Sequence, residues 1–180
     1  AKSHAAPDYT AFLNPGALAG KRLGLVRQAL GFNVDVDAAM ERAVATLTAA
    51  GAIVIDVKID GYRDWEGAEL TVLLYEFKDG INAYLKAAGV KPASLAELIA
   101  WNTDHREATM PWFGQELFEM AQAKGSLKDP EYIQARAKAR KLAATDGLLA
   151  TLDANRVDVL IVPSAGPAWI TDPLLGDHFG

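Results

Sequence analysis

Residues 22–59 carry the pattern that most restricts how this chain can fold: a strand, a helix and a second strand in close succession. The segments "RLGLVR" (22–27) and "AIVIDVKI" (52–59) are short apolar runs that predict buried strands. The segment "DVDAAMERAVATLTAAG" (35–51) between them predicts a helix. Two strands joined by one helix pair in parallel through a right-handed crossover, so these residues predict a βαβ unit.

The ends of this helix are marked by polar residues and by a glycine. Asp35 or Asp37 can cap its first turn, and Gly51 can close its last turn. The residues that share one apolar face at helical spacing are Met40, Val44 and Leu47.

A long helical region follows the second strand. Apolar residues at helical spacing predict four helices, at 69–89, 94–102, 112–125 and 129–152. Ser94 and Glu97 stand in capping-box positions at the start of the second of these helices. Asp129 and Pro130 are expected to be the N-cap and the first helical residue of the last one, which we expect to kink near Gly147.

A third strand is predicted for "VDVLIV" (157–162), directly after the last helix. This order of elements is typical of an α/β protein, but three strands are too few for so many helices in a doubly wound domain. The final residues, 170–180, contain no closing element. We therefore expect residues 1–180 to form a single domain with a helix-rich, partial α/β fold that is incomplete.

Charge and composition exclude several classes of function. The net charge of −5 and the pI near 5.2 leave no basic surface, so no nucleic-acid partner is expected. Without cysteine there are no disulfides and no thiolate chemistry, and His4, His105 and His178 lack metal-ligand spacing. Neither a metal site nor a cofactor is expected. Because no signal peptide and no run of about 18 apolar residues is found, we expect a cytoplasmic protein without a membrane partner.

Ser164 follows the third predicted strand in "VDVLIVPSAGPAW" (157–169), where three interpretations are open. A nucleophilic serine needs the G-x-S-x-G pattern between a strand and a helix. Here Val162 occupies the leading glycine position, and Pro167 opposes an immediate helix. The second interpretation is a turn residue that ends the strand. The third is a non-catalytic pocket wall, because open α/β sheets bind ligands at the carboxyl ends of their strands.

Four segments occur in an order and spacing that match a known family. They are "DYTAFLNPGALAGKRLGLVR" (8–27), "LLYEFKDGINAYL" (73–85), "PWFGQELFEMAQAKGSLKDPEYIQAR" (111–136) and "VDVLIVPSAGPAW" (157–169). Together they resemble the amidase signature family. The resemblance covers nearly the whole chain and implies a hydrolase that cleaves carboxamide C–N bonds through a serine acyl-enzyme.

The resemblance also implies where the catalytic residues should be. Family members use a Ser–cis-Ser–Lys triad whose nucleophile follows a Gly/Ser-rich run. The serines of this chain are Ser3, Ser94, Ser126 and Ser164, and none lies in such a run. No catalytic residue is therefore assigned here. We expect the triad to precede residue 1 and the family's closing segment to follow residue 180, so this C-terminal-side portion should be inactive alone.

Four residues are candidates for the wall of the substrate pocket. Ser164 matches a position of the family's P-[ST]-x-G-P motif, which the resemblance places beside the substrate cleft. Ser164, Pro167 and Trp169 are therefore candidates, and Tyr75 in "YEFKDG" is a fourth. The alternative gives them structural roles only: turn residues after the strand, Trp169 as apolar cover, and Tyr75 beside an apolar helical stripe. In that alternative Glu76 and Lys78 lie on the solvated side of the helix.

Two functional classes follow. In the first, the chain is part of an amidase, with a small-molecule amide as substrate and the remaining segments of the same enzyme as partners. In the second, it is a self-standing α/β binding or interaction module without catalysis, because "AYLKAAG" (83–89) and "ARAKARKLAA" (135–144) are amphipathic. A fragment of a larger sheet would expose apolar surface and edge strands, so we also expect a tendency to form homo-oligomers.

Overall fold

The computed structural model describes residues 8–174 and 176. By their internal packing these residues fall into two compact units. Unit 1 contains the described residues up to Ile59 and the segment Leu148–Pro167. Unit 2 contains Asp60–Gly147 and the described residues from Ala168 onward.

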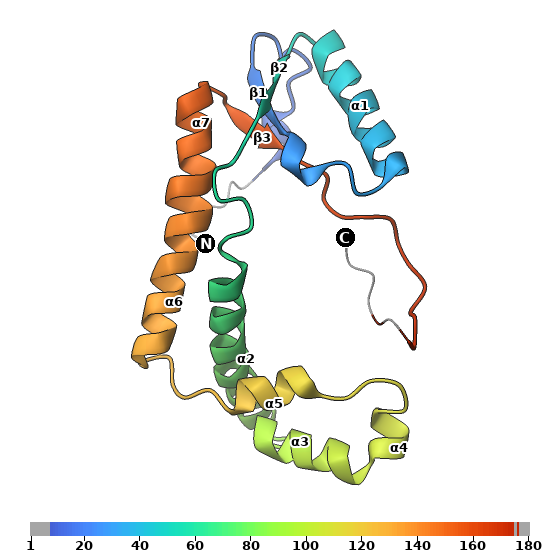
Figure 1. Ribbon diagram of the computed structural model, residues 1–180, viewed down its shortest axis with the longest axis vertical. Helices are drawn as coiled ribbons and strands as arrows, with labels where there is room; N and C mark the ends of the chain where they lie inside the picture. The colour runs from blue at the N-terminus through green and yellow to red at the C-terminus, as the bar shows by residue number, and fades with distance from the viewer. Residues whose placement is uncertain (1–7, 175, 177–180) are drawn as a thin grey trace. The chain divides into compact units, whose positions relative to one another are not determined.

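Unit 1 is built on a parallel, three-stranded sheet in the order β2-β1-β3 (Figure 1). Its strands are β1 (Arg22–Val26), β2 (Ile53–Val57) and β3 (Val159–Ile161). Leu23 of the central strand pairs with Val54 on one side and with Val159 on the other. The predicted βαβ unit and third strand are confirmed, and with them the helix-rich α/β class.

The central strand β1 forms the core of unit 1. Leu25 and Val26 are fully buried. Gly24 lies where neighbouring side chains approach the main chain: a Cβ atom there would be 2.9 Å from Leu160 Cδ2 and 3.0 Å from Val57 Cγ2. Glycine at this position therefore lets two neighbouring strands bring large side chains over the central one.

The helix α1 (Val34–Ala49) is capped by Asn33, so the prediction that Asp35 or Asp37 caps it is wrong. Asn33 Oδ1 accepts hydrogen bonds from two main-chain N–H groups of the first turn, at 3.0 and 3.1 Å. The physical reason is that Asn33 precedes both aspartates and already satisfies the donors that a cap must satisfy. The two aspartates lie in the first turn, where their charge still favours the helix.

The rest of α1 follows the sequence pattern. Its predicted apolar face, formed by Met40, Val44 and Leu47, is half-buried. Gly51 follows the helix with a φ of 91°, as its predicted closing role requires. A Cβ atom on Gly51 would also lie 3.2 Å from Ala19 Cα, so two independent constraints favour glycine there.

Unit 2 is helical. Its longest helix, α2 (Glu66–Ala88), continues through Gly80 and ends at Gly89, which has a φ of 65°. The other helices are α3 (Leu95–Asp104), α4 (Arg106–Thr109), α5 (Glu116–Gln122) and α6 (Pro130–Arg140). A π-helical segment, η4 (Lys141–Leu149), contains Gly147 and leads into α7 (Ala150–Asn155), which belongs to unit 1. The buried core of unit 2 comprises Leu74, Leu95 and Ala121.

The helix predicted from residue 112 begins only at Glu116. The side chain of Gln115 accounts for the difference. Its Nε2 donates to the Ile99 carbonyl at 3.2 Å, and its Oε1 accepts from Asn102 Nδ2 at 3.1 Å. These bonds tie Gln115 to α3, so the residues before it form a connection rather than a first helical turn.

Two predicted helix starts are confirmed, at Ser94 and at Asp129. In the first, the acidic residue of the capping box bonds to a different main-chain N–H group than predicted. Ser94 Oγ accepts from Glu97 N at 3.2 Å, but the Glu97 carboxylate accepts from Ala93 N at 2.9 Å rather than from Ser94. That bond lowers the pKa of Glu97. Asp129 is the N-cap of α6 and Pro130 its first residue, as predicted.

Candidate functional site

The carboxyl ends of β1 and β3 lie at one edge of the unit 1 sheet, because the two strands are parallel neighbours. β3 is followed by Pro163 and Ser164, whereas β1 is followed by the 3₁₀ helix η3 (Arg27–Ala29) and a loop. Ser164 and Pro167 are exposed. Residues 165–171 form no helix, so this serine lacks the strand–turn–helix setting of a hydrolase nucleophile.

Phe32, in the loop after η3, lies close to Gly166 in the segment that follows β3. A Cβ atom built at Gly166 would lie 3.4 Å from Phe32 Cε2, so the ring lies next to this glycine. The ring is nevertheless 46% exposed. Phe32, which was not among the predicted pocket residues, therefore lies beside Gly166, and Gly166 is two residues after Ser164 at the same edge of the sheet.

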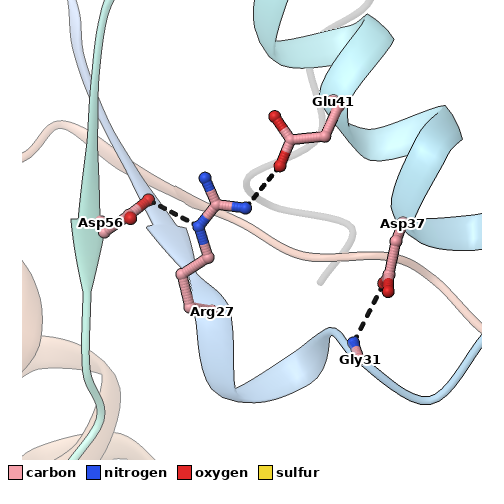
Figure 2. A network of polar contacts seen from close by, with 5 residues as sticks. All are labelled: Arg27, Gly31, Asp37, Glu41 and Asp56. Carbon is pink, nitrogen blue, oxygen red and sulfur yellow. Dashed lines mark hydrogen bonds and ion pairs between the residues drawn. The ribbon is translucent and has the colours of Figure 1, made fainter. Parts of the chain in front are cut away.

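The loop that carries Phe32 is held on both sides. Gly31 has a φ of 89°, and its N–H donates to Asp37 Oδ1 at 3.0 Å (Figure 2). Asn33 is fixed as the cap of α1. Before the loop, Gln28 exchanges two hydrogen bonds with the main chain of Ile59, at 2.7 and 3.1 Å. Phe32 is thus carried by a restrained segment.

Arg27 forms a charged cluster beside this loop (Figure 2). Its Nε donates to Asp56 Oδ1 of β2 at 2.9 Å, and its Nη1 donates to Glu41 Oε1 of α1 at 2.5 Å. The carboxylates of Glu41 and then Asp56 raise the pKa of Arg27. The cluster ties α1 to the sheet, although such exposed ion pairs stabilise a fold only weakly.

In unit 2, Tyr75 is buried at 3% exposure and bonded to α6. Its hydroxyl donates to Glu131 Oε2 at 2.6 Å, and Lys124 Nζ donates to Glu131 Oε1 at 2.8 Å. The hydrogen bond to Glu131, followed by burial, raises the pKa of Tyr75 to about 12. The bonds from Lys124 and Tyr75 lower the pKa of Glu131. The side chain of Tyr75 therefore joins two helices.

The interpretation of Lys78 as a solvated residue is wrong. Its Nζ donates to the Gln122 carbonyl at 2.9 Å and also to the Lys124 carbonyl, so it binds the end of α5. Glu76 is exposed, as expected, but it accepts a hydrogen bond from the Tyr132 hydroxyl at 2.7 Å. Helical spacing did not reveal these roles because the partners come from other helices.

Replacing Tyr75 with phenylalanine should lower the thermal midpoint of the protein by roughly 2–4 °C, because one bond between α2 and α6 is lost. The difference should depend on pH. Since the pKa of Tyr75 is raised from 10.0 to about 12, its stabilisation is complete below pH 10 and is lost as the pH rises toward 12. Thermal midpoints of both proteins, measured from neutral to alkaline pH, should therefore converge. A difference that stays constant up to pH 12 contradicts this account.

An apolar groove lies between α2 and α5 in unit 2. Leu73 and Leu117 in it are 57% and 62% exposed, and the rings of Phe77 and Phe118 stack at 5.3 Å. The residues lining it are Leu70, Leu73, Leu74, Phe77, Leu117 and Phe118. The sequence identified the apolar stripe on α2, but it did not show that part of the stripe faces outward.

The four predicted pocket residues are divided between the units. Ser164 and Pro167 belong to unit 1, and Tyr75 and Trp169 belong to unit 2. Trp169 is 39% exposed and lies in an irregular segment. Of these four, Ser164 is the one at the sheet edge that also carries Phe32.

Among residues 8–174 and 176, no group of three or more His, Asp or Glu side chains is arranged to hold a metal ion; His4 and His178 lie outside this range. No helix in the same part of the chain combines the length and hydrophobicity that a bilayer crossing requires.

Comparisons with known proteins agree with one another. The family model described as Amidase matches residues 1–175. A protein of Arabidopsis thaliana described as a probable amidase is 30% identical over 164 residues, which are 85% of this chain and 30% of that protein. The chain is also similar to the native peptide amidase from Stenotrophomonas maltophilia, with 41% identity and a TM-score of 0.86 over 98% of this chain and 36% of that one.

A second solved structure, a peptide amidase in complex with the competitive inhibitor chymostatin, is 42% identical with a TM-score of 0.89. The alignment covers 97% of this chain and 36% of that structure. The chain therefore spans about a third of the length of the relatives that it matches.

Proposed function

The chain belongs to the amidase family, and on that basis we propose that the full-length protein is a hydrolase that cleaves carboxamide C–N bonds through a serine acyl-enzyme. The observation that carries this proposal is the match of the family model across residues 1–175. In such a reaction a serine oxygen attacks the carbonyl carbon, the amine leaves, and water releases the carboxylate. Similarity to peptide amidases makes peptide amides the first substrates to assay.

Within that enzyme, this chain would supply scaffold and part of the pocket wall. Ser164, Pro167 and Trp169 are proposed to line the substrate pocket. The position of Ser164 at the carboxyl end of β3 supports this role, since that edge is where α/β sheets bind ligands. Tyr75 is proposed as a fourth pocket residue, and the bond from its hydroxyl to Glu131 would hold α2 against α6.

The direct test uses the purified full-length protein with peptide amides and with nitroanilides of simple acyl groups. We expect turnover of at least one class, with release of ammonia or amine and of a carboxylate. Residues 1–180 alone should be inactive, because the nucleophile is proposed to lie elsewhere. Failure of the full-length protein on all of these amides would favour an interaction module without catalysis. Turnover by residues 1–180 alone would contradict the proposal that the nucleophile lies outside these residues.

Replacing Ser164 with alanine in the full-length protein should reduce kcat by less than about tenfold, because its hydroxyl is proposed to contact substrate rather than to attack it. Removal of a serine nucleophile lowers kcat by a factor of about 10⁶ in a well-studied hydrolase. The two roles are therefore easily separated by steady-state kinetics. A fall in kcat of more than about a thousandfold, with an unchanged thermal midpoint, would make Ser164 the nucleophile.

Location, domain structure and assembly belong to the same proposal. We propose a cytoplasmic enzyme in which both units form one domain with the remaining segments of the polypeptide. The exposed groove between α2 and α5 supports a tendency of the isolated chain to associate into homo-oligomers. Cell fractionation and sedimentation of the full-length protein test location and assembly.

A further inference from the structure

We propose that Phe32 is a specificity-determining residue of the amidase site, whose ring contacts the apolar acyl part of the substrate beside Ser164. This inference rests on the proposed amidase function. It assigns to the loop after β1 a contact that the motif around Ser164 does not supply.

The placement follows from the sheet. Leu25 of β1 pairs with Ile161 of β3 near the carboxyl ends of both strands, so the segments that follow emerge from the same edge. Phe32 Cε2 lies 3.4 Å from where a Cβ atom of Gly166 would be, so the two segments lie close together at this edge. A substrate that reaches Ser164 at this edge therefore passes close to the Phe32 ring.

The exposure of the ring suits a binding surface. The Phe32 ring lies next to Gly166, while 46% of the residue stays accessible. Ligand pockets are lined mainly by apolar and aromatic side chains with a few polar groups to orient the ligand. Phe32 and the Ser164 hydroxyl together provide one group of each kind. An apolar acyl chain would cover the open face of the ring and gain from leaving water.

The loop also holds Phe32 in a defined position. The φ of 89° at Gly31, the bond from Gly31 N–H to Asp37, and the two bonds to Asn33 Oδ1 fix the residues on either side. A contact that discriminates between substrates needs such support, because a mobile ring would adapt to any of them.

The experiment compares Phe32→Ala with wild type in the full-length enzyme, using acetyl and phenylpropionyl nitroanilides. We expect kcat/KM for the phenylpropionyl substrate to fall about tenfold and that for the acetyl substrate to change less than twofold. The ratio of kcat/KM for the phenylpropionyl substrate to kcat/KM for the acetyl substrate measures this preference. Phe32→Leu, which retains an apolar side chain, should lower this ratio by about threefold. Val34→Ala is the matched control, since Val34 is 80% exposed just after the same loop, and its ratio should equal that of wild type.

The outcomes separate this inference from the function on which it rests. Wild-type enzyme that cleaves neither nitroanilide nor any peptide amide overturns the proposed function. Active wild type with an unchanged ratio in Phe32→Ala overturns the role of Phe32, and so does an equal loss for both substrates, which indicates a structural role. If Phe32→Ala does not fold, the ratio in Phe32→Leu decides, and an unchanged ratio there overturns the inference.

Discussion

Replacing Leu95 with alanine should lower the free energy of unfolding by about 2–5 kcal/mol, the largest loss that we expect from one side chain. Leu95 is completely buried at the first position of α3 and belongs to the core with Leu74 and Ala121. Its side chain thus joins α3 to α2 and α5. Truncation removes apolar contacts and leaves a cavity, which these packed helices can close only in part.

The matched control for this change is Leu117→Ala in the same unit. Leu117 is 62% exposed in the groove, so its truncation should cost less than about 1 kcal/mol. Denaturant unfolding of the purified full-length protein, with midpoint and slope both recorded, measures the two losses. Equal losses at Leu95 and Leu117 would show that the core of unit 2 is not where the structure places it.

The second large effect is expected at Gly24, where alanine should destabilise the protein by about 1–3 kcal/mol. The added Cβ atom would lie 2.9 Å from Leu160 Cδ2 and between 3.0 and 3.1 Å from both Val57 γ-carbons. The leucine can rotate its end away, but the branched valine is stiff at χ1. The central strand cannot move aside either, because it is paired on both sides.

Gly80→Ala is the corresponding control, and its effect on the free energy of unfolding should have the opposite sign to that of Gly24→Ala. Gly80 lies inside α2 with nothing within 4 Å of an added Cβ atom. Alanine there should stabilise the protein by about 0.5–1 kcal/mol, because it favours the helix more than glycine does. The two variants make the same chemical change, so opposite shifts of the unfolding midpoint isolate crowding at Gly24. A stabilised Gly24→Ala variant would contradict the packing of the sheet.

Local sequence patterns predicted several elements correctly, but not every side-chain partner. The strands β1 and β2, helix α1 and the start of α3 at Ser94 were predicted from patterns within a few residues. Two errors are at helix starts, where a side chain competes for the main chain, and a third is Lys78, whose partners lie at and just after the end of α5. Asn33 takes the capping role that the sequence also allowed for Asp35, and Gln115 is the N-cap of α5 while its side chain bonds to α3.

The candidate site was predictable only in part. The position of Ser164 after a strand and the order of four segments were enough to indicate an amidase, and the pocket roles of Ser164, Pro167, Trp169 and Tyr75 stay predictions. The proximity of Phe32 to Gly166 could not be predicted from the sequence. Phe32 is far from Gly166 along the chain, and no spacing rule connects a loop after one strand to a loop after another.

The amino-acid sequence alone therefore determined the local elements, because hydrogen bonding and apolar periodicity act between residues that are close along the chain. It determined the parallel pairing of β1 and β2 for the same reason, through the short connection between them. Tertiary structure decided which side chains meet: Tyr75 with Glu131, which are 56 residues apart, Lys78 with the end of α5, and Phe32 with Gly166. Such contacts depend on the path of the whole chain, and it is the path that brings distant groups within a few ångströms.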